Sequence, residues 1–326
     1  MNRRDLLILG GVAAVRPRTV LAQQSEKTYR LGFLGFGTSV MAASTIEGLG
    51  AALGRRGYSV GNNLLIEARY AEGRLDRLPG LVKELIDIPV DVIAITGYPA
   101  ARAAKDGTTT VPIVLVAAGD PVQLGLVASY SHPGGNITGV SDMSAELISK
   151  RLDLIMTAVP GLKRVAVLYN ASDAAMIGRY QVVAAAASTR GISVQALGVR
   201  EPDDFASAFA AMSGERPDGI LMVTDTLTRL NRKRVFEFAA ANRTPAIYEF
   251  EAFAREGGLM SYGAERSEKI DRAVELIDRI LRGAKPADLP IEQPAHFRFI
   301  VNLKTAKALG LEMPATLLGM ADDVID

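Results

Sequence analysis

Polar and aromatic residues follow several apolar runs of the sequence, at the points where those runs end. Hydroxyl and backbone N–H groups donate hydrogen bonds to a carboxylate, and carboxylates accept them from an ammonium or hydroxyl group. Aromatic rings at such positions cover apolar surface. The positions predicted to bind a small solute are Ser39, Thr96, Gly97, Tyr98, Asp120, Tyr169, Asn170, Asp225, Tyr248 and Glu249. We expect no catalytic residue and no metal ligand in this set.

Each of these residues also has an ordinary structural interpretation. Asp120 precedes Pro121 and could start a turn, and Asp225 could cap the helix that follows it. The tyrosines could pack at the edge of a core. The same kind of residue recurs at equivalent strand ends in both halves of the chain, and this recurrence favours binding.

The turn GFGTSV, residues 35–40, tests the nucleotide-binding interpretation. A dinucleotide fold requires G-x-G-x-x-G, and Val40 stands where the third glycine is needed. The chain contains neither a P-loop motif nor G-x-S-x-G, and its two histidines are followed by Pro133 and Phe297. The sequence therefore predicts neither a cofactor nor an enzyme, although a mechanism that uses carboxylates alone stays open.

Composition narrows the function classes further. The chain has 326 residues, a formal net charge of +1, no cysteine and two histidines. It therefore lacks the positive charge of a nucleic-acid-binding protein and the ligands of a thiolate or histidine-rich metal site. Length and apolar content leave room for two hydrophobic cores.

The first residues resemble an export signal peptide. Arg3 and Arg4 precede an apolar run over residues 6–15, and Val20-Leu21-Ala22 ends in a small residue suited to a signal peptidase. A membrane anchor is the alternative, but the apolar run has about half of the ~20 residues that a span requires. We predict an export signal of the twin-arginine or Sec type over residues 1–22.

Beyond the signal, β-rich runs alternate with amphipathic helical patterns. Predicted strands are Tyr29–Gly35, Leu64–Tyr70, Val90–Thr96, Ile113–Ala117 and Asn136–Val140, then Arg164–Tyr169, Ser193–Val199, Gly219–Thr224, Pro245–Glu249 and Gly258–Ser261. Predicted helices are Val40–Arg56, Asp76–Asp87, Pro99–Gly107, Ala174–Arg190, Asp203–Met212, Thr228–Asn242 and Glu265–Arg282. The strands are nearly continuous apolar runs, as in parallel sheets covered on both faces. The predicted fold class is α/β, with two Rossmann-like lobes.

The predicted lobes exchange chain segments. We expect an N-terminal lobe of residues 28–142 plus about 263–290, and a C-terminal lobe of 143–262 plus about 291–326. The join near residues 138–146 is short and polar, and the proline-containing segment after residue 288 is expected to form a tail across the lobes. Ligands of open α/β sheets bind at the carboxyl ends of the strands, so a cleft between the lobes is expected.

Several segments carry a resemblance to a known family. They are GLVASYSHPGGNITGVS (125–141), KRLDLIMTAVPGLKRVAVLYN (150–170), GGLMSYG (257–263) and the closing segment of residues 289–325. In this order they resemble the substrate-binding proteins of ABC transporters of the tryptophan/tyrosine type, and the likeness spans nearly the whole chain.

This resemblance implies a type I periplasmic-binding-protein fold around a central ligand cleft. It implies a monomeric periplasmic receptor that closes on a small solute and presents it to a membrane permease with its ATPase. The cargo expected from the strand-end chemistry is an aromatic or branched amino acid, or a related aromatic carboxylic acid. A sugar or nucleoside receptor, a transcriptional sensor of the same fold and a secreted enzyme are the alternatives.

Overall fold

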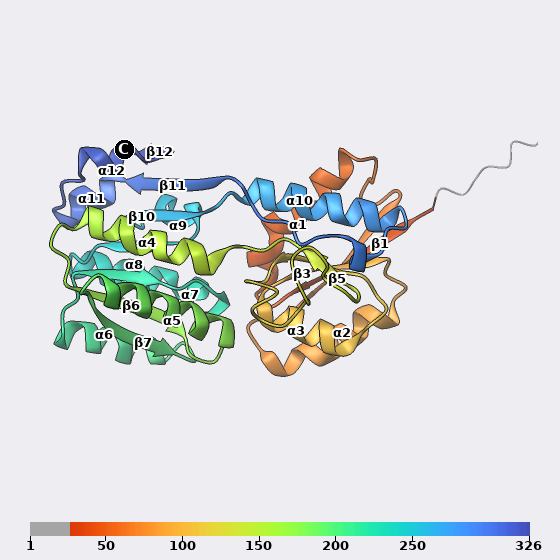
Figure 1. Ribbon diagram of the computed structural model, residues 1–326, viewed down its shortest axis with the longest axis horizontal. Coiled ribbons are helices and arrows are strands. Elements are labelled where there is room, and N and C mark those ends of the chain that lie inside the picture. The colour runs from red at the N-terminus through yellow and green to blue at the C-terminus, as the bar shows by residue number, and fades with distance from the viewer. Residues whose placement is uncertain (1–26) are drawn as a thin grey trace, which may run out of the picture.

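The computed structural model describes residues 27–326, which form two α/β lobes side by side (Figure 1). The predicted export signal over residues 1–22 lies outside the described residues. Across residues 27–326, no helix is both long and apolar enough to span a bilayer.

The N-terminal lobe is built on a five-stranded parallel sheet of order β2-β1-β3-β4-β5. Its elements are β1 (Tyr29–Gly35), α1 (Ser39–Gly54), β2 (Leu64–Tyr70), η1 (Leu75–Arg77), α2 (Leu78–Asp87), β3 (Val92–Thr96), α3 (Tyr98–Gly107), β4 (Ile113–Ala117) and β5 (Ile137–Gly139). The first four residues of β3 and of β4 are buried, as expected for strands covered on both faces.

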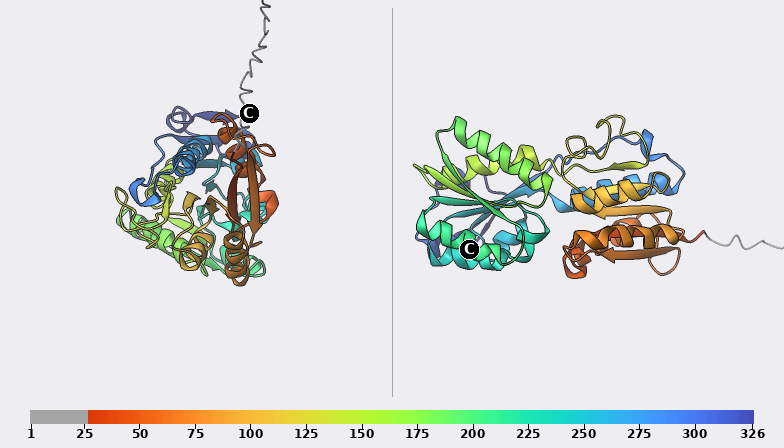
Figure 2. Two further views of the ribbon diagram at one scale, coloured as in Figure 1. Left: turned by 90° about the vertical axis from the view of Figure 1, so that its right-hand side faces the viewer. Right: turned by 90° about the horizontal axis from the view of Figure 1, so that it is seen from below.

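The C-terminal lobe contains a seven-stranded sheet of order β12-β11-β10-β9-β8-β6-β7. Its elements are α4 (Ser144–Ala158), β6 (Arg164–Asn170), α5 (Ala174–Thr189), β7 (Ser193–Val199), α6 (Asp204–Gly214), β8 (Gly219–Met222), α7 (Thr226–Leu230), α8 (Arg232–Ala241), β9 (Ala246–Tyr248), α9 (Glu251–Arg255), β10 (Met260–Ala264), β11 (Phe297–Asn302), α11 (Leu303–Leu309), α12 (Ala315–Leu318) and β12 (Asp323–Ile325). Helices cover both faces of this sheet (Figure 2, right).

The chain returns once to the N-terminal lobe. Helix α10 (Arg266–Leu281), blue in Figure 1, lies against the red and orange elements and is followed by η2 (Pro286–Asp288). Its buried face, including Ile270, Val274 and Ile277, shares one hydrophobic core with Leu31 of β1 and Leu53 of α1. The apolar face of α10 thus packs in the core of the N-terminal lobe, although β10 before it and β11 after it belong to the sheet of the C-terminal lobe.

Three segments connect the lobes, and backbone hydrogen bonds join them. Glu292 donates its N–H to the carbonyl of Gly139, and Ser141 donates to Glu292, both at 2.9 Å. The N–H of Glu265 donates to His296, also at 2.9 Å. The segments β5–α4, β10–α10 and η2–β11 are therefore linked to each other at the place where a hinge between the lobes would lie.

Beyond short elements that the sequence did not predict, such as α9, α11, α12 and β12, the structure differs from the sequence-based expectation in three further respects. Helix α4 begins inside the segment interpreted as a polar join, although Leu147, Ile148, Leu152 and Ile155 have helical spacing and are buried. The single helix predicted over residues 228–242 is two helices, α7 and α8, because Asn231 caps the first and donates Nδ2 to the carbonyl of Leu227.

The third difference concerns the tail. Leu289 and Ile291 pack in cores of the N-terminal lobe, as a tail across the lobes requires, but from β11 onward the segment forms strands of the C-terminal sheet, which the sequence did not predict. Strand β11 pairs antiparallel with β10 and parallel with β12, so this sheet is not wholly parallel. The prolines at 290 and 294 precede β11, where they do not remove a ladder hydrogen bond.

Candidate functional site

A cleft of about 580 Å³ lies between the lobes and is lined by both. This volume is within the range of pockets that bind small molecules, roughly 300–1,000 Å³. Helices α1, α3, α5, α7 and α10 all begin at the cleft. The site is therefore formed by the carboxyl ends of strands and the N-termini of helices, as α/β sheets predict.

On the N-terminal wall, the first turn of α3 could receive an anion, although its Pro99 has no N–H to donate. Gly97, the residue before α3, has φ +92° and gives no side-chain cap, and its own N–H donates to the carbonyl of Ala117 at 2.7 Å. A Cβ at this glycine would lie 3.0 Å from Cβ of Phe36. By contrast, Oγ1 of Thr38 already accepts the N–H of Met41 in α1.

On the C-terminal wall, two aspartates combine a capping role with access to the cleft. Asp173 accepts the N–H of Ala175 at 2.8 Å, and Asp225 accepts the N–H of Thr228 at 2.9 Å. Burial raises the pKa of the Asp173 carboxyl, and the neighbouring charge of Asp225 raises it further. An ammonium group of a ligand would relieve this repulsion.

The inner end of the cleft holds a buried ion cluster centred on Arg179 of α5. Its guanidinium contacts the Asp142 carboxylate at 3.1 Å and the Glu249 carboxylate at 3.4 Å. Fully buried Arg151 lies 3.6 Å from the same Glu249 oxygen and donates Nε to the carbonyl of Tyr262. Four charged side chains thus share one network in which each charge has an opposite partner.

The Asp142 carboxylate connects this network to both lobes. It accepts the N–H of Gly119 at 3.1 Å from the N-terminal lobe and contacts Arg179 in the C-terminal lobe. Burial would raise the pKa of Asp142, but the charges of Arg179 and Lys269 and the hydrogen bonds from Ser144 outweigh burial and lower it. Asp142 stays ionised in a segment that connects the lobes.

The structure brings five of the ten predicted residues to the cleft. The lining includes Thr96, Gly97, Tyr98, Asp225 and Glu249. Asp225 and Glu249 are also structural, since the first caps α7 and the second belongs to the buried ion cluster.

The other five predicted residues do not line the cleft. Ser39 is exposed in the first turn of α1, between Thr38 and Val40, which do line it. Asp120 accepts the N–H groups of Val122 and Gln123 in a turn.

The remaining three lie behind the cleft surface. Tyr169 stacks on Tyr180 with ring centroids 4.5 Å apart. Asn170 donates Nδ2 to Asp225 at 2.6 Å and so positions that carboxylate. Tyr248 is fully buried within an edge-to-face aromatic cluster. In the structure these three side chains contact other parts of the protein and do not line the cleft.

Sequence reasoning missed the charged residues that helices carry into the cleft, above all Arg179 and Lys269. A signal for Arg179 was present, because it is the only charged residue of the sixteen-residue helix AAMIGRYQVVAAAAST. A single arginine in so apolar a helix needs buried partners.

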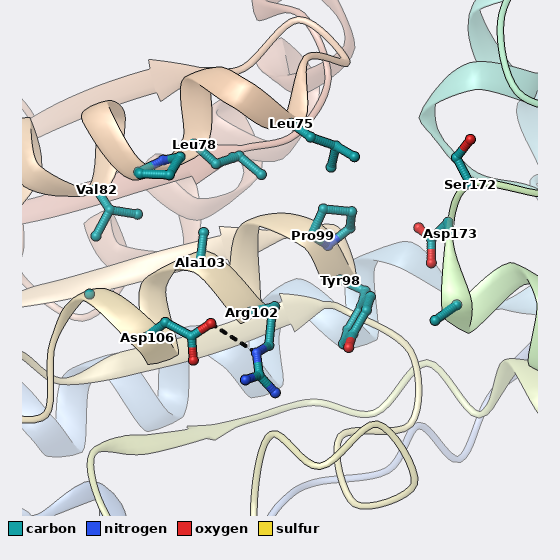
Figure 3. A pocket seen from close by; sticks show the side chains of 13 residues that line it. Leu75, Leu78, Val82, Tyr98, Pro99, Arg102, Ala103, Asp106, Ser172 and Asp173 are labelled. Carbon is teal, nitrogen blue, oxygen red and sulfur yellow. Dashed lines mark hydrogen bonds and ion pairs between the residues drawn. The ribbon is translucent and has the colours of Figure 1, made fainter.

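A second hollow of about 530 Å³ adjoins the cleft along α2 and α3 (Figure 3). Leu75, Leu78 and Val82 form one side, and Arg102 pairs with Asp106 on α3 at 2.9 Å. Tyr98 and Asp173 line both hollows from opposite lobes. Its shape therefore depends on how far the lobes are apart.

Comparison with known proteins places these features in a family. The model of the family described as ABC transporter substrate binding protein matches residues 40–325. A tyrosine-binding protein of Clostridioides difficile is 28% identical over 266 residues, which cover 82% of this chain and 76% of that protein.

Solved structures agree with the sequence match. An ABC domain from Streptococcus pneumoniae in complex with L-Trp is 26% identical, with a TM-score of 0.85 over 92% of this chain and 100% of that one. A conserved domain protein from Vibrio cholerae is 25% identical, with a TM-score of 0.86 over 91% of this chain and all of that one. The predicted two-lobed α/β fold with a central cleft is confirmed.

Proposed function

The chain belongs to the ABC transporter substrate binding protein family, and we propose that it is the extracytoplasmic receptor for an aromatic or branched amino acid or a related aromatic carboxylic acid. Two similar proteins reported above are a tyrosine-binding protein and a domain in complex with L-Trp. This cargo class accounts for the chemistry of the cleft better than a neutral sugar or nucleoside does.

The observation that carries the proposal is the placement of opposite polar partners on opposite walls. The uncapped first turn of α3 favours a carboxylate, while Asp173 and Asp225 across the cleft favour an ammonium group. A free amino acid has both groups on one carbon and would bridge the lobes. Its side chain would meet the apolar lining of Phe36, Met41 and Phe250.

The mechanism is closure about the hinge. A ligand shifts the equilibrium between open and closed forms only by its difference in affinity for the two, so it must contact both walls. The three connecting segments allow this rotation, and the ion pair of Arg179 with Asp142 fixes the C-terminal wall to one of them.

The partners follow from the family. The closed receptor would present its cargo to a membrane permease with its ATPase, acting as a monomer after export directed by residues 1–22. The receptor itself would have no enzymatic activity, no cofactor and no nucleic-acid partner.

The test is titration calorimetry on the mature protein with tyrosine, tryptophan, phenylalanine, leucine, benzoate, a neutral sugar and a nucleoside. We expect heat of binding and a higher thermal midpoint with at least one amino acid or aromatic acid, and a smaller radius of gyration by X-ray scattering. Binding of the sugar or nucleoside alone, or turnover of the bound compound, would contradict the proposal.

A further inference from the structure

One end of the cleft collects positive charge around a single aromatic ring. The guanidinium carbon of Arg229, from α7 of the C-terminal lobe, lies 5.1 Å from the centroid of Phe250. The Lys269 Nζ, from α10 on the opposite side, lies 6.0 Å from the same centroid. Arg266, one turn before Lys269, donates to the hydroxyls of Ser44 and Thr45 in α1. We call Arg229, Lys269 and Arg266 the cationic end of the cleft.

Two of these cations lack an acceptor. Lys269 is only 8% exposed. Among residues 27–326, neither it nor Arg229 has a side-chain hydrogen bond or a carboxylate within 4.0 Å. Neighbouring Arg232, by contrast, pairs with Glu256 at 2.6 Å. Contact with the Phe250 ring attracts a cation but supplies no lone pair to its N–H groups.

Two of the nearby carboxylates are engaged elsewhere, since Asp142 and Glu249 contact Arg179. Glu251, at the start of α9, acts on the charge of Arg266, but within residues 27–326 it forms no ion pair with any of the three cations. Burial lowers the pKa of Lys269, partly offset by Asp142 and Glu249. Burial and the charge of Arg266 lower the pKa of Arg229. Within residues 27–326, Arg229 and Lys269 therefore have no directly bonded anion.

The two unpaired cations face a space that the cleft already encloses, since both residues and Phe250 line it. They come from opposite lobes and both lie beside the Phe250 ring, so an anion next to this ring would be attracted by both charges. The first turn of α3, which begins at Tyr98, is a separate place for a carboxylate. The cleft thus offers two places for negative charge.

We infer that the cargo carries a second carboxylate, distal to the group held at α3, which binds between Arg229 and Lys269 beside the ring of Phe250. The inference rests on the proposed function and narrows its cargo to amino acids and aromatic acids that carry a second carboxylate. A carboxylate at this place would accept charge-assisted hydrogen bonds from both lobes and so favour the closed form.

The test uses matched pairs of probes in titration calorimetry. Phenylalanine is compared with 4-carboxyphenylalanine, and benzoate with benzene-1,4-dicarboxylate. We expect the second member of at least one pair to bind tenfold or more tightly than the first. Equal affinities within both pairs, or a preference for the first members, would overturn the inference while the proposed function stands. No binding by these compounds or by any amino acid would instead remove the proposed function.

Variants then locate the effect. Arg229→Gln and Lys269→Met should each reduce the affinity ratio within the pair by tenfold or more. The control Lys233→Gln removes an exposed charge of α8 that does not line the cleft and should leave the ratio unchanged. A ratio that neither cleft variant changes would overturn the assignment.

A second readout does not depend on ligand. Because Lys269 is buried without an acceptor, Lys269→Met should raise the thermal midpoint of the ligand-free protein, whereas removal of a paired lysine would lower it. A lowered midpoint in a variant that folds, as judged by circular dichroism, would show that Lys269 is already satisfied and would contradict the inference.

Discussion

The two walls of the cleft bind by different means. The lining that the N-terminal lobe supplies from its strand ends and α1, over residues 35–45, 96–99 and 116–119, contains no charged side chain. The C-terminal lobe lines the same cleft with charged residues, among them Asp173, Arg179, Asp225, Arg229, Arg232, Glu249 and Arg298. The strand ends and α1 of the N-terminal lobe offer backbone N–H groups, hydroxyls and apolar surface, and we call them the uncharged wall. Formal charge comes from the C-terminal lobe together with Arg266 and Lys269 of α10, and we call these residues the charged wall.

This difference has an energetic consequence. Backbone N–H groups are positioned by the fold, and most side-chain substitutions do not remove them. Ligand binding at the N-terminal wall therefore depends on the backbone conformation there. Buried charges depend on each other, so the C-terminal wall depends on complete partners. Substitutions in the two walls should therefore differ in both size and kind of effect.

The largest effect is expected from Arg179→Met on the charged wall. The change leaves Asp142 and Glu249 buried with one partner fewer, and breaking a buried ion pair from one side costs about 3–5 kcal/mol. Urea denaturation at pH 7 measures the loss. Arg179→Lys keeps the charge and should lose less, and a loss below 1 kcal/mol for Arg179→Met would show that the cluster is well hydrated.

A smaller effect, of a different kind, is expected from Gly97→Ala on the uncharged wall. An alanine at φ +92° and ψ 135° is strained by about 1–3 kcal/mol. The new Cβ would also press on Phe36, which displaces the first turn of α3 and weakens ligand binding. Urea denaturation and calorimetry with the tightest solute measure both losses.

The matched control for this change is Gly80→Ala in α2. No heavy atom lies within 4 Å of its Cβ position, and the residue is helical. It should stabilise the protein by about 0.5–1 kcal/mol and leave affinity unchanged. Equal effects of the two substitutions would show that the backbone conformation at Gly97 does not require a glycine.

Asp225 separates capping from ligand binding on the charged wall. Asp225→Ala removes the cap of α7 and should cost about 1 kcal/mol of stability. Asp225→Asn keeps an oxygen for the cap but loses the charge that would bind an ammonium group. It should therefore lower affinity for phenylalanine more than affinity for 3-phenylpropionate, which lacks the amine. Equal losses for the two compounds would remove Asp225 from the amine site.

The sequence predicted the uncharged wall better than the charged one. Residues 96–98 follow the apolar run of β3 directly, so their place at the cleft follows from local pattern and from the rule for parallel sheets. Arg179 and Lys269 lie within helices, and their partners are distant in sequence, as Asp142 is for Arg179. No local pattern encodes such pairings.

The fold shows the same division. The sequence predicts apolar strands such as β6 within one residue of their bounds, because a strand buried on both faces is a nearly continuous run of apolar residues. The antiparallel β11 and its pairing with β10 were not predicted, because a strand's partner depends on the path of the whole chain. Helix α4 had a readable pattern but lies beside the connecting segment, whose polar residues masked its start.

The smallest effect expected at neutral pH concerns the hinge between the walls. Partial burial would raise the pKa of the Glu268 carboxyl. The backbone N–H groups of Ala295 and His296 and the charge of Arg272 outweigh burial and lower it to about 2. The unfolded value is near 4.5, so this carboxylate stabilises the folded state fully above that pH. The contribution is lost as pH falls from about 4.5 toward 2.

Urea midpoints at pH 7, 4.5, 3.5 and 2.5 should therefore fall more steeply below pH 4.5 for the wild-type protein than for Glu268→Gln. Glu84, an exposed carboxylate of α2 paired only with Arg69, gives the matched control Glu84→Gln, which should keep the wild-type slope. Because Glu268 joins α10 to the η2–β11 segment, its protonation loosens the hinge without altering either wall. Affinity at pH 7 should then be equal in the control variant and the wild type, and parallel slopes for all three proteins would show that the hinge carboxylate is not held as the structure has it.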